Sequence, residues 1–294
     1  MGETVLLLTH RLDEYIRDRY RRLAAEAGRA VVILYNRGDD PVPDRRLPPD
    51  LPVFSFDLGD LRRLGYPRKG LQPSGRDIDC FVLLYARAHP PAGRLWVVEY
   101  DVDYGGRWGE LFDAFAASGA DLLATTLQRY AARPDWENWR GVRAPKGRTA
   151  RHLLLSAFLP CYRLSPAALA VLESAYRAGW SGHYEATVPT ILSAAGLVLE
   201  DLGGDGVFVA PGNRNRFYTN TPAAADLSPG SFVFRPARTT RGREPGLLWH
   251  PVKPPVGAGG WPTGRRARLI RWARRLLRRW SGARRTGRAP DAAE

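Results

Sequence analysis

Apolar runs and helical patterns alternate along the first half of the chain. Residues 4–9 and 30–35 are apolar runs typical of buried strands, and between them apolar side chains recur at helical spacing up to Gly28, which takes a capping position. A third strand is expected at residues 53–56. Because β-α-β units place their strands parallel with the helix against one face, this opening predicts an α/β fold.

A second β-α-β unit surrounds an acidic segment. The run 95–98, Leu-Trp-Val-Val, predicts a buried strand, and residues 108–115 repeat Trp, Leu and Phe at the spacing i, i+3, i+4, i+7. Residues 120–127 then predict a returning strand. Farther along, Ser165 followed by a proline predicts the start of a helix, and another helix is expected to begin near residue 184.

Three acids follow the run 95–98 directly: Glu99, Asp101 and Asp103. If the strand stays extended, side chains alternate and all three carboxylates point to one face. Unpaired carboxylates at such distances repel one another, so a cation is expected among them, and their oxygen atoms suit Mg²⁺ or Mn²⁺. Solvated loop acids are the alternative, but ligands of open α/β sheets bind where strands end.

Length and composition fit a globular protein with one large domain and an appendage. The chain has 294 residues, of which 44% are hydrophobic. No run approaches the ~20 apolar residues of a membrane span. Two cysteines, Cys80 and Cys161, are too few for a disulfide framework, which favours a reducing cytoplasm. We expect a domain at residues 1–260 and a basic tail at residues 261–294.

Most of the net charge of +14 lies in that tail. Residues 262–294 contain eleven arginines and two acids, a charge of +9, which leaves +5 for the rest of the chain. A nucleic-acid-binding protein would be expected to have a basic body as well. The charge therefore favours no nucleic-acid partner.

Residues 265–280 have the pattern of a basic amphipathic helix. One face of the helical wheel carries the apolar residues Leu269, Trp272, Ala273, Leu276, Leu277 and Trp280. The other carries Arg271, Arg274, Arg275, Arg278 and Arg279. Such a helix is expected to lie in an anionic membrane surface, where each arginine adds ~1 kcal/mol to binding. Docking onto the protein's own body is the alternative.

The order of elements resembles a GT-A-type nucleotide-sugar glycosyltransferase. The resemblance rests on V-E-Y-D-V-D-Y-G-G from Val98, R-L-S-P from Arg163, G-H-Y-E-A-T-V-P-T from Gly182 and H-P-V-K from His250. Together these segments look like a poorly characterised glycosyltransferase-like family of bacteria and fungi. The resemblance spans residues 4–253 and implies a Rossmann-like GT-A fold, with a central mixed, mostly parallel sheet flanked by helices.

The resemblance also implies a divalent cation, Mn²⁺ or Mg²⁺, that bridges the donor diphosphate. Asp101 and Asp103 match its D-x-D ligands, with Glu99 as an alternative ligand beside Asp101, and His250 matches a further ligand. Glu185 matches the acid near the acceptor and is a candidate general base at the start of a helix.

Residues that follow the first two strands are expected to bind the nucleotide-sugar donor. Thr9, His10 and Arg11 end the first strand and Asn36 ends the second, which places all four at one edge of the sheet. Lys253 is expected near the donor phosphates.

Tryptophans and a histidine are candidates for acceptor binding. Trp136 and Trp139 belong to the segment 128–151, which is too long for an idle connection in a compact domain. Trp180 and His183 precede the helix near residue 184. Their rings could stack on sugars, although most tryptophans are packing residues.

The leading hypothesis is a metal-dependent, hexosyltransferase-like glycosyltransferase. It would move a sugar from a nucleotide-sugar donor to a hydroxyl of a glycan or lipid-linked acceptor, as a peripheral protein at the cytoplasmic face of the plasma membrane. A non-catalytic nucleotide- or sugar-binding protein of the same fold is the alternative. A metal-dependent phosphohydrolase is disfavoured, because its D-x-D motif normally follows the first strand.

Overall fold

The computed structural model describes residues 2–38, 47–70, 77–219 and 230–254. The described residues up to Lys253 belong to one compact unit. None of the described helices is both long enough and apolar enough to span a membrane. The predicted domain boundary at residue 260 and the amphipathic helix at residues 265–280 lie outside the described residues and stay predictions.

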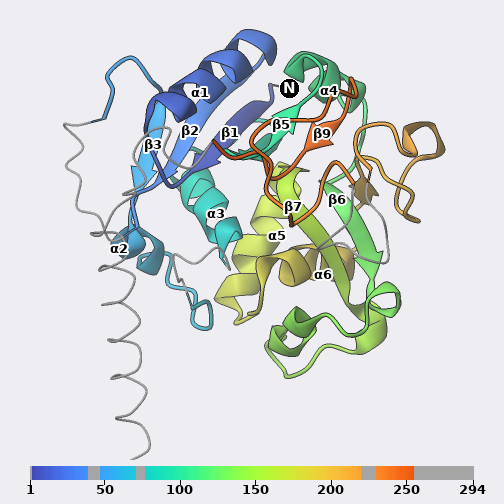
Figure 1. Ribbon diagram of the computed structural model, residues 1–294. Coiled ribbons are helices and arrows are strands. Elements are labelled where there is room, and N and C mark those ends of the chain that lie inside the picture. The colour runs from blue at the N-terminus through green and yellow to red at the C-terminus, as the bar shows by residue number, and fades with distance from the viewer. Residues whose placement is uncertain (1, 39–46, 71–76, 220–229, 255–294) are drawn as a thin grey trace, which may run out of the picture. The chain divides into compact units, whose positions relative to one another are not determined.

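A seven-stranded sheet forms the centre of the described part of the chain (Figure 1). Its spatial order is β3 (Val53–Phe56), β2 (Ala30–Asn36), β1 (Thr4–Thr9), β4 (Leu95–Glu99), β7 (Leu155–Leu164), β6 (Leu122–Arg129) and β8 (Leu199–Asp201). Neighbouring strands pair in parallel except at β7, which is antiparallel to β4 and β6. The predicted α/β class, with a mixed and mostly parallel sheet, is confirmed.

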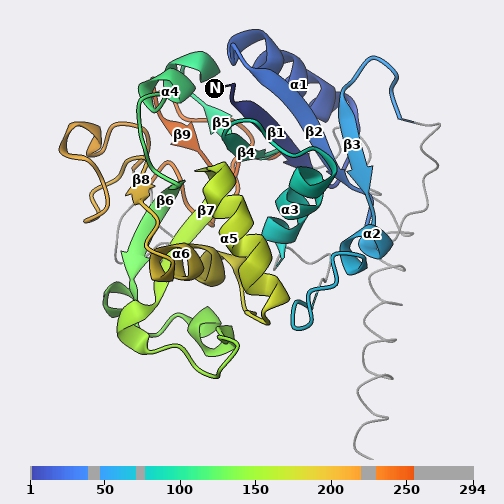
Figure 2. The same cartoon turned by 180° about the vertical axis from the view of Figure 1, so that it is seen from behind.

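Helices cover both faces of this sheet (Figures 1 and 2). One face carries α1 (Glu14–Glu26) and α4 (Trp108–Ala114). The other carries α2 (Leu58–Arg62), α3 (Ile78–Ala88), α5 (Pro166–Arg177) and α6 (Tyr184–Ala194). Alternation along β1 explains the two layers, because Leu6 and Leu8 point into one apolar core while Val5 and Leu7 point into the other.

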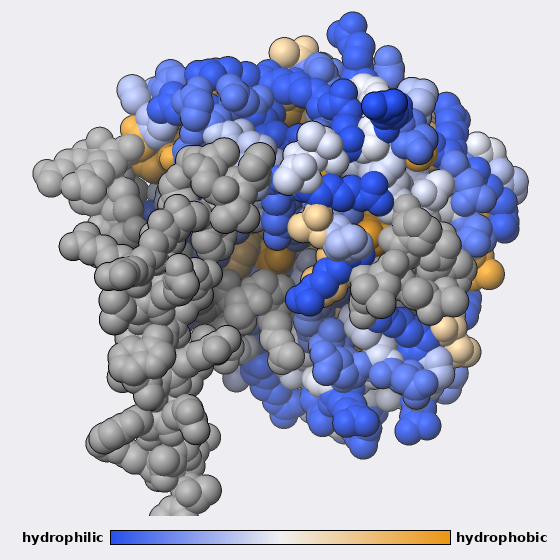
Figure 3. Space-filling view, in the orientation of Figure 1, coloured by the Kyte–Doolittle hydropathy of each residue, from blue (hydrophilic) through white to orange (hydrophobic). Residues whose placement is uncertain are grey.

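The outer surface has the polarity expected of a protein in contact with water. On the face in Figure 3, hydrophilic residues predominate and apolar ones are scattered. Among the described residues the large exposed apolar side chains are Leu153, Val198, Val207 and Phe234. They come from separate segments, and isolated apolar side chains of this kind are normal.

The pattern of the sequence does not predict β7, the ten-residue strand between β4 and β6. Its residues are apolar without the alternation of a half-buried strand, and Pro160 interrupts them. Proline has no N–H to donate to a ladder. In the structure, Pro160 lies just beyond the end of β4 and within the irregular part of the pairing with β6, where that donor is not required.

The acidic strand is shorter than predicted. β4 ends at Glu99, and Asp103 instead opens β5 (Asp103–Tyr104), which pairs with β9 (Leu248–Trp249) in a separate two-stranded sheet. The expectation of an extended strand through Asp103 is therefore wrong. This small sheet fastens the segment around residue 250 to the acidic segment.

A buried ion pair joins distant parts of the fold. Arg163 on β7 is 0% exposed, and its guanidinium binds the carboxylate of Glu3 (3.1 Å) and the carbonyl oxygens of Phe115 (2.7 Å) and Ser118 (2.9 Å). Glu3 also pairs with Arg29 (2.8 Å), just before β2. One carboxylate therefore holds the beginnings of β1 and β2 to the end of β7.

We predict that Glu3→Gln lowers the free energy of unfolding by about 3 kcal/mol, because it leaves the buried Arg163 guanidinium without its counter-charge. Urea unfolding followed by circular dichroism measures this. The control is Glu14→Gln, whose carboxylate pairs with Arg21 at the surface and should cost less than about 1 kcal/mol. Equal losses in the two variants would contradict the role given to the buried pair.

Candidate functional site

Two of the three acids stay together where the chain turns after β4. The Val102 N–H donates to the Glu99 carbonyl (2.9 Å), and the Tyr100 N–H donates to the carbonyl of Leu8 on β1 (2.9 Å). Asp101 lies inside this turn and is almost completely buried. The turn brings the carboxylates of Glu99 and Asp101 to within 4.8 Å of each other.

Asp103 is separated from these acids because the extended conformation stops at Glu99. Its carboxylate pairs with three arginines: Arg22 (2.5 Å), Arg19 (3.0 Å) and Arg241 (3.6 Å). Burial alone would raise the pKa of Asp103, but these cations outweigh it and lower that pKa. The expectation that all three carboxylates share one face is wrong. The structure brings Asp101 together with Glu99, the alternative ligand, and not with Asp103.

His250 and Lys253 reach Asp101 from the segment that follows β9. The Val252 N–H donates to the Asp101 carbonyl (2.7 Å) and holds this segment beside Asp101. His250 Nε2 then lies 3.5 Å from Asp101 Oδ1, and Lys253 Nζ lies 3.3 Å from Asp101 Oδ2. The structure thus brings together two residues that are about 150 positions from Asp101 in the sequence.

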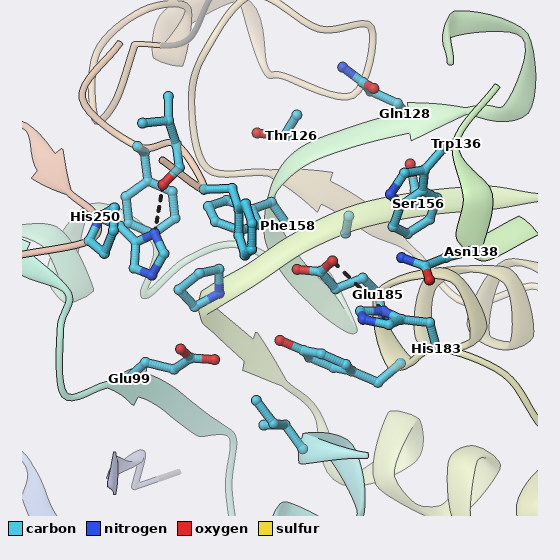
Figure 4. Close-up of a pocket in the computed structure, with 18 of the residues that line it drawn as sticks. Glu99, Thr126, Gln128, Trp136, Asn138, Ser156, Phe158, His183, Glu185 and His250 are labelled. Carbon is cyan, nitrogen blue, oxygen red and sulfur yellow. Dashed lines mark hydrogen bonds and ion pairs between the residues drawn. The ribbon is translucent and has the colours of Figure 1, made fainter. Parts of the chain in front are cut away.

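The contact between Asp101 and His250 brings two acceptors together whenever the ring is neutral. His250 Nδ1 donates to the carbonyl of Val233 (2.8 Å), so in the neutral ring Nε2 carries a lone pair (Figure 4). That lone pair faces Asp101 Oδ1, a buried oxygen with no hydrogen-bond partner among the described residues. Two acceptors face each other, so either a proton or a metal ion is required between them.

The electrostatics of Glu99 lead to the same conclusion. Burial, followed by the carboxylates of Asp101 and Glu185, raises the pKa of Glu99 well above its usual range. A divalent cation would reverse this effect and keep the carboxylate ionised. Glu99, Asp101 and His250 offer ligand atoms that all lie within 4.8 Å of one another. Two carboxylates and an imidazole suit Mn²⁺, and the imidazole makes Mg²⁺ the poorer fit.

A second group of acids already contains its own cation. Asp77, Asp79 and Cys80 also gather within 4.8 Å, but the ammonium of Lys69 lies 2.9 Å from Asp79 and 3.3 Å from Asp77. Tyr176 donates a further hydrogen bond to Asp79. The acids at this second place are therefore neutralised by a buried lysine, whereas the lysine beside Asp101, Lys253, is half-exposed.

A cavity of about 890 Å³ extends from the Glu99–Asp101–His250 group along β6 and β7. In Figure 4, Glu185 lies between His250 at one end and Trp136 at the other. The cavity thus joins the candidate metal ligands to the candidate base in one continuous space.

Glu185 occupies the first turn of α6, and His183 caps that helix by accepting the Glu185 N–H at Nδ1 (3.3 Å). The Glu185 carboxylate accepts the N–H of Leu159 on β7 (3.4 Å) and lies 3.8 Å from His183 Nδ1. Burial raises the pKa of Glu185 to about 7, although the Leu159 N–H and Arg133 oppose the increase. A carboxyl group with such a pKa exchanges protons near neutrality.

The four candidate donor residues at the ends of β1 and β2 lie outside the lining of this cavity. The hydroxyl of Thr9 donates to the carbonyl of Arg11 (2.8 Å), and the Asn36 side chain accepts the N–H of Gly38 (2.9 Å). Arg11 also pairs with Asp13. These three side chains therefore stabilise local turns. His10 packs edge-on against the ring of Tyr100, with the ring centroids 5.0 Å apart.

Of the candidate acceptor residues, Trp136 and His183 line the cavity, whereas Trp139 and Trp180 do not. Trp139 is 6% exposed and its indole N–H donates to the carbonyl of Arg133 (2.7 Å). Trp180 packs against the same small apolar cluster. Both rings therefore pack within the protein and away from the cavity, and stacking of a ligand on them stays a prediction.

Four uncharged polar residues of the lining were not predicted: Thr126, Gln128, Asn138 and Ser156. Thr126 and Gln128 lie two apart near the carboxyl end of β6. The rule that selected the acids after β4, polar residues where an apolar strand ends, applies to them equally. Ser156 had no such signal, because β7 itself was not predicted.

No known protein family and no curated protein matches the sequence. Solved structures that the chain resembles include one assigned as a glucose-1-phosphate thymidylyltransferase from Bacillus anthracis in complex with sucrose, at a TM-score of 0.38 and 11% identity. That similarity covers 68% of this chain and 86% of that one. Apo mouse xyloside xylosyltransferase 1 has a TM-score of 0.35 and 12% identity, over 69% of this chain and 84% of the other. Similarity at this level identifies neither a family nor a reaction.

We predict that Asp101→Asn weakens Mn²⁺ binding more than tenfold, since loss of an outer-shell partner alone costs about 10- to 100-fold in other metal sites. Electron paramagnetic resonance of free Mn²⁺ during titration of the protein measures the affinity. Asp103→Asn is the matched control, because its carboxylate pairs with arginines instead, and it should leave the affinity within about threefold. Greater loss in Asp103→Asn than in Asp101→Asn would restore the D-x-D pair and contradict the assignment made here.

Proposed function

We propose that the protein is a metal-dependent glycosyltransferase that moves a sugar from a nucleotide-sugar donor to a hydroxyl acceptor. The observation that carries the proposal is the shared cavity, in which Glu99, Asp101 and His250 gather at one end and Glu185 lies nearby. This arrangement places candidate cation ligands and a proton acceptor in one space. In a direct displacement by a hydroxyl, the cation stabilises the leaving diphosphate and the base accepts the hydroxyl proton.

The metal end of the cavity suits a donor diphosphate. When bound by Glu99, Asp101 and His250, Mn²⁺ would act as a Lewis acid that offsets the charge of the departing diphosphate. Lys253 is 47% exposed at its side chain and lies beside Asp101, so its ammonium can reach a phosphate at the mouth of the cavity. Fixed positive charge of this kind stabilises a developing anion.

Glu185 is the proposed general base. It is half-buried, its carboxylate faces the cavity, and its pKa of about 7 allows it to accept a proton from an acceptor hydroxyl near neutral pH. His183, which lies 3.8 Å from the carboxylate, fixes the start of α6 and with it the position of this group. Direct displacement of the diphosphate by the acceptor oxygen is the reaction that needs such a base.

The proposal predicts turnover that depends on ionised Glu185. Nucleotide release from a panel of nucleotide sugars, assayed with Mn²⁺, should show a kcat/KM that falls about tenfold per pH unit below pH 7, because a base with a raised pKa is protonated there. Glu185→Gln should lower kcat by at least about 100-fold. Its Mn²⁺ affinity should be unchanged, which is the control for folding. Full turnover in Glu185→Gln would exclude it as the base.

The membrane part of the proposal concerns residues 265–280. We expect this segment to bind anionic bilayers, so exchanging Arg271, Arg274, Arg275, Arg278 and Arg279 for Gln in the full chain should weaken binding to vesicles that contain phosphatidylglycerol by at least about 100-fold. Co-sedimentation measures the binding. The charge-matched control exchanges five exposed arginines of the body: Arg62, Arg214, Arg216, Arg235 and Arg243. Equal weakening by both sets would show that overall charge, and not this segment, attracts the membrane.

A further inference from the structure

The wall of the cavity contains a strained residue. Thr126 on β6 has φ +50°. Among the described non-glycine residues, only Thr126 and Asn215 have a positive φ. The pairing of β6 with β7 slips on both sides of this position, between Leu123 and Thr125 and again between Thr125 and Gln128. A left-handed conformation is unfavourable for a β-branched residue. The surroundings must therefore impose it.

A buried pair, Asp201 and Tyr218, imposes this conformation. The Tyr218 hydroxyl accepts the N–H of Thr126 (2.7 Å) and donates to Asp201 Oδ1 (2.7 Å). Asp201 Oδ2 accepts the N–H of Leu127 (2.7 Å). Both backbone donors of the bulge are thus bound by two side chains that are each 1% exposed. The bulge is held by specific bonds from outside its own strand.

The chain makes room for this pair at Gly204. A Cβ atom there would lie 2.9 Å from the Tyr218 hydroxyl oxygen, and Gly204 itself has φ +70°. Only glycine satisfies both conditions without displacement. The approach of the loop after β8 to the Tyr218 ring therefore forms part of the same arrangement.

The bulge changes which side chains of β6 enter the cavity. In a regular strand Thr126 would share a face with Leu122 and Ala124, but across the interrupted ladder Leu127 joins their core instead, so Thr126 and Gln128 take the opposite face. Both residues line the cavity, together with Asn138 and Ser156 (Figure 4). Ser156 lies on β7, opposite Gln128. The side chains of Gln128, Asn138 and Ser156 form no hydrogen bond to another described residue.

This wall has a different chemistry from the metal end. Thr126, Gln128, Asn138 and Ser156 offer hydroxyl and amide groups, which hydrogen-bond and carry no charge, and the charged residues Arg133, Asp135 and Glu137 also line the cavity. Such groups match the hydroxyls of a sugar, whereas a phosphate or carboxylate would call for cations. Trp136 lines the same part of the cavity and adds an apolar ring. The wall and the candidate base Glu185 lie on the same cavity (Figure 4).

We propose that Thr126, Gln128, Asn138 and Ser156 form a binding site for an uncharged sugar, and that Asp201 and Tyr218 are positioning residues that hold the wall of this site in shape. The assignment of this sugar as the acceptor rests on the proposed function. Sugar binding itself does not require turnover and is tested without a donor.

Saturation-transfer difference NMR with a panel of methyl glycosides of uncharged hexoses tests the proposal on the full chain. We expect transfer to at least one glycoside, weakened at least about fivefold in Gln128→Ala, which removes one amide, and in Tyr218→Phe, which keeps the ring and removes the hydroxyl that holds Thr126. The matched control is Tyr162→Phe. Tyr162 is equally buried, but its hydroxyl has no hydrogen-bond partner among the described residues, so this exchange should leave binding unchanged.

Two results overturn the proposal: no methyl glycoside binds, or a glycoside binds equally well to the wild type and to Gln128→Ala. Circular dichroism shows whether Tyr218→Phe is folded. If Tyr218→Phe does not fold, the test of sugar binding rests on Gln128→Ala, whose position is partly exposed. Nucleotide release with Mn²⁺ is measured separately. If the wild type releases nucleotide but binds no glycoside, this inference alone is refuted; if it binds a glycoside but releases no nucleotide, the proposed donor chemistry alone is refuted.

Discussion

Asp101 Oδ1 and His250 Nε2 face each other across 3.5 Å inside the protein, and in the neutral state of the ring both are acceptors. Such a contact is unfavourable unless a positive charge lies between the two atoms. Glu99 adds a third electron-rich group to the same space. A proton on the ring or a metal ion satisfies this contact, and the proposed chemistry depends on the metal ion.

The rest of the fold determines that these groups meet. The small sheet of β5 and β9 joins the segment of His250 to the acidic turn. Asp103 pairs with arginines and lies apart from the candidate ligands, which its spacing in the sequence does not reveal. On the other side, the Asp201–Tyr218 pair shapes β6 through two backbone N–H groups. One cavity thereby acquires a charged end and an uncharged wall.

Sequence periodicity predicted the helices and strands that depend on residues close to one another in the sequence. The strands β1, β2 and β3 and the helix α1 follow from apolar runs and helical spacing, and an aspartate or serine cap fixes where helices such as α5 begin. β7 was not predicted, because a continuously apolar strand with Pro160 in it has no distinctive period. Its place between β4 and β6 depends on tertiary pairing.

The candidate site could likewise be predicted only where it depends on residues close in the sequence. The rule of polar residues at the end of an apolar strand selected Glu99 and Asp101, and the structure brings His250, Lys253 and Glu185 to the same cavity. The choice between Asp103 and Glu99 could not be made from the spacing, because it depends on a turn fixed by a hydrogen bond from Tyr100 to the neighbouring strand.

The most direct test of the central claim is a thermal-shift measurement of the full chain with nucleoside diphosphates and nucleotide sugars, each with and without Mn²⁺. A ligand at a hundredfold excess over its Kd stabilises the folded state by about 2.7 kcal/mol. The account predicts a shift with one family of nucleotides that requires Mn²⁺ and disappears in Asp101→Ala. A shift that is independent of Mn²⁺ or persists in Asp101→Ala, or the absence of any shift across the panel, would contradict it.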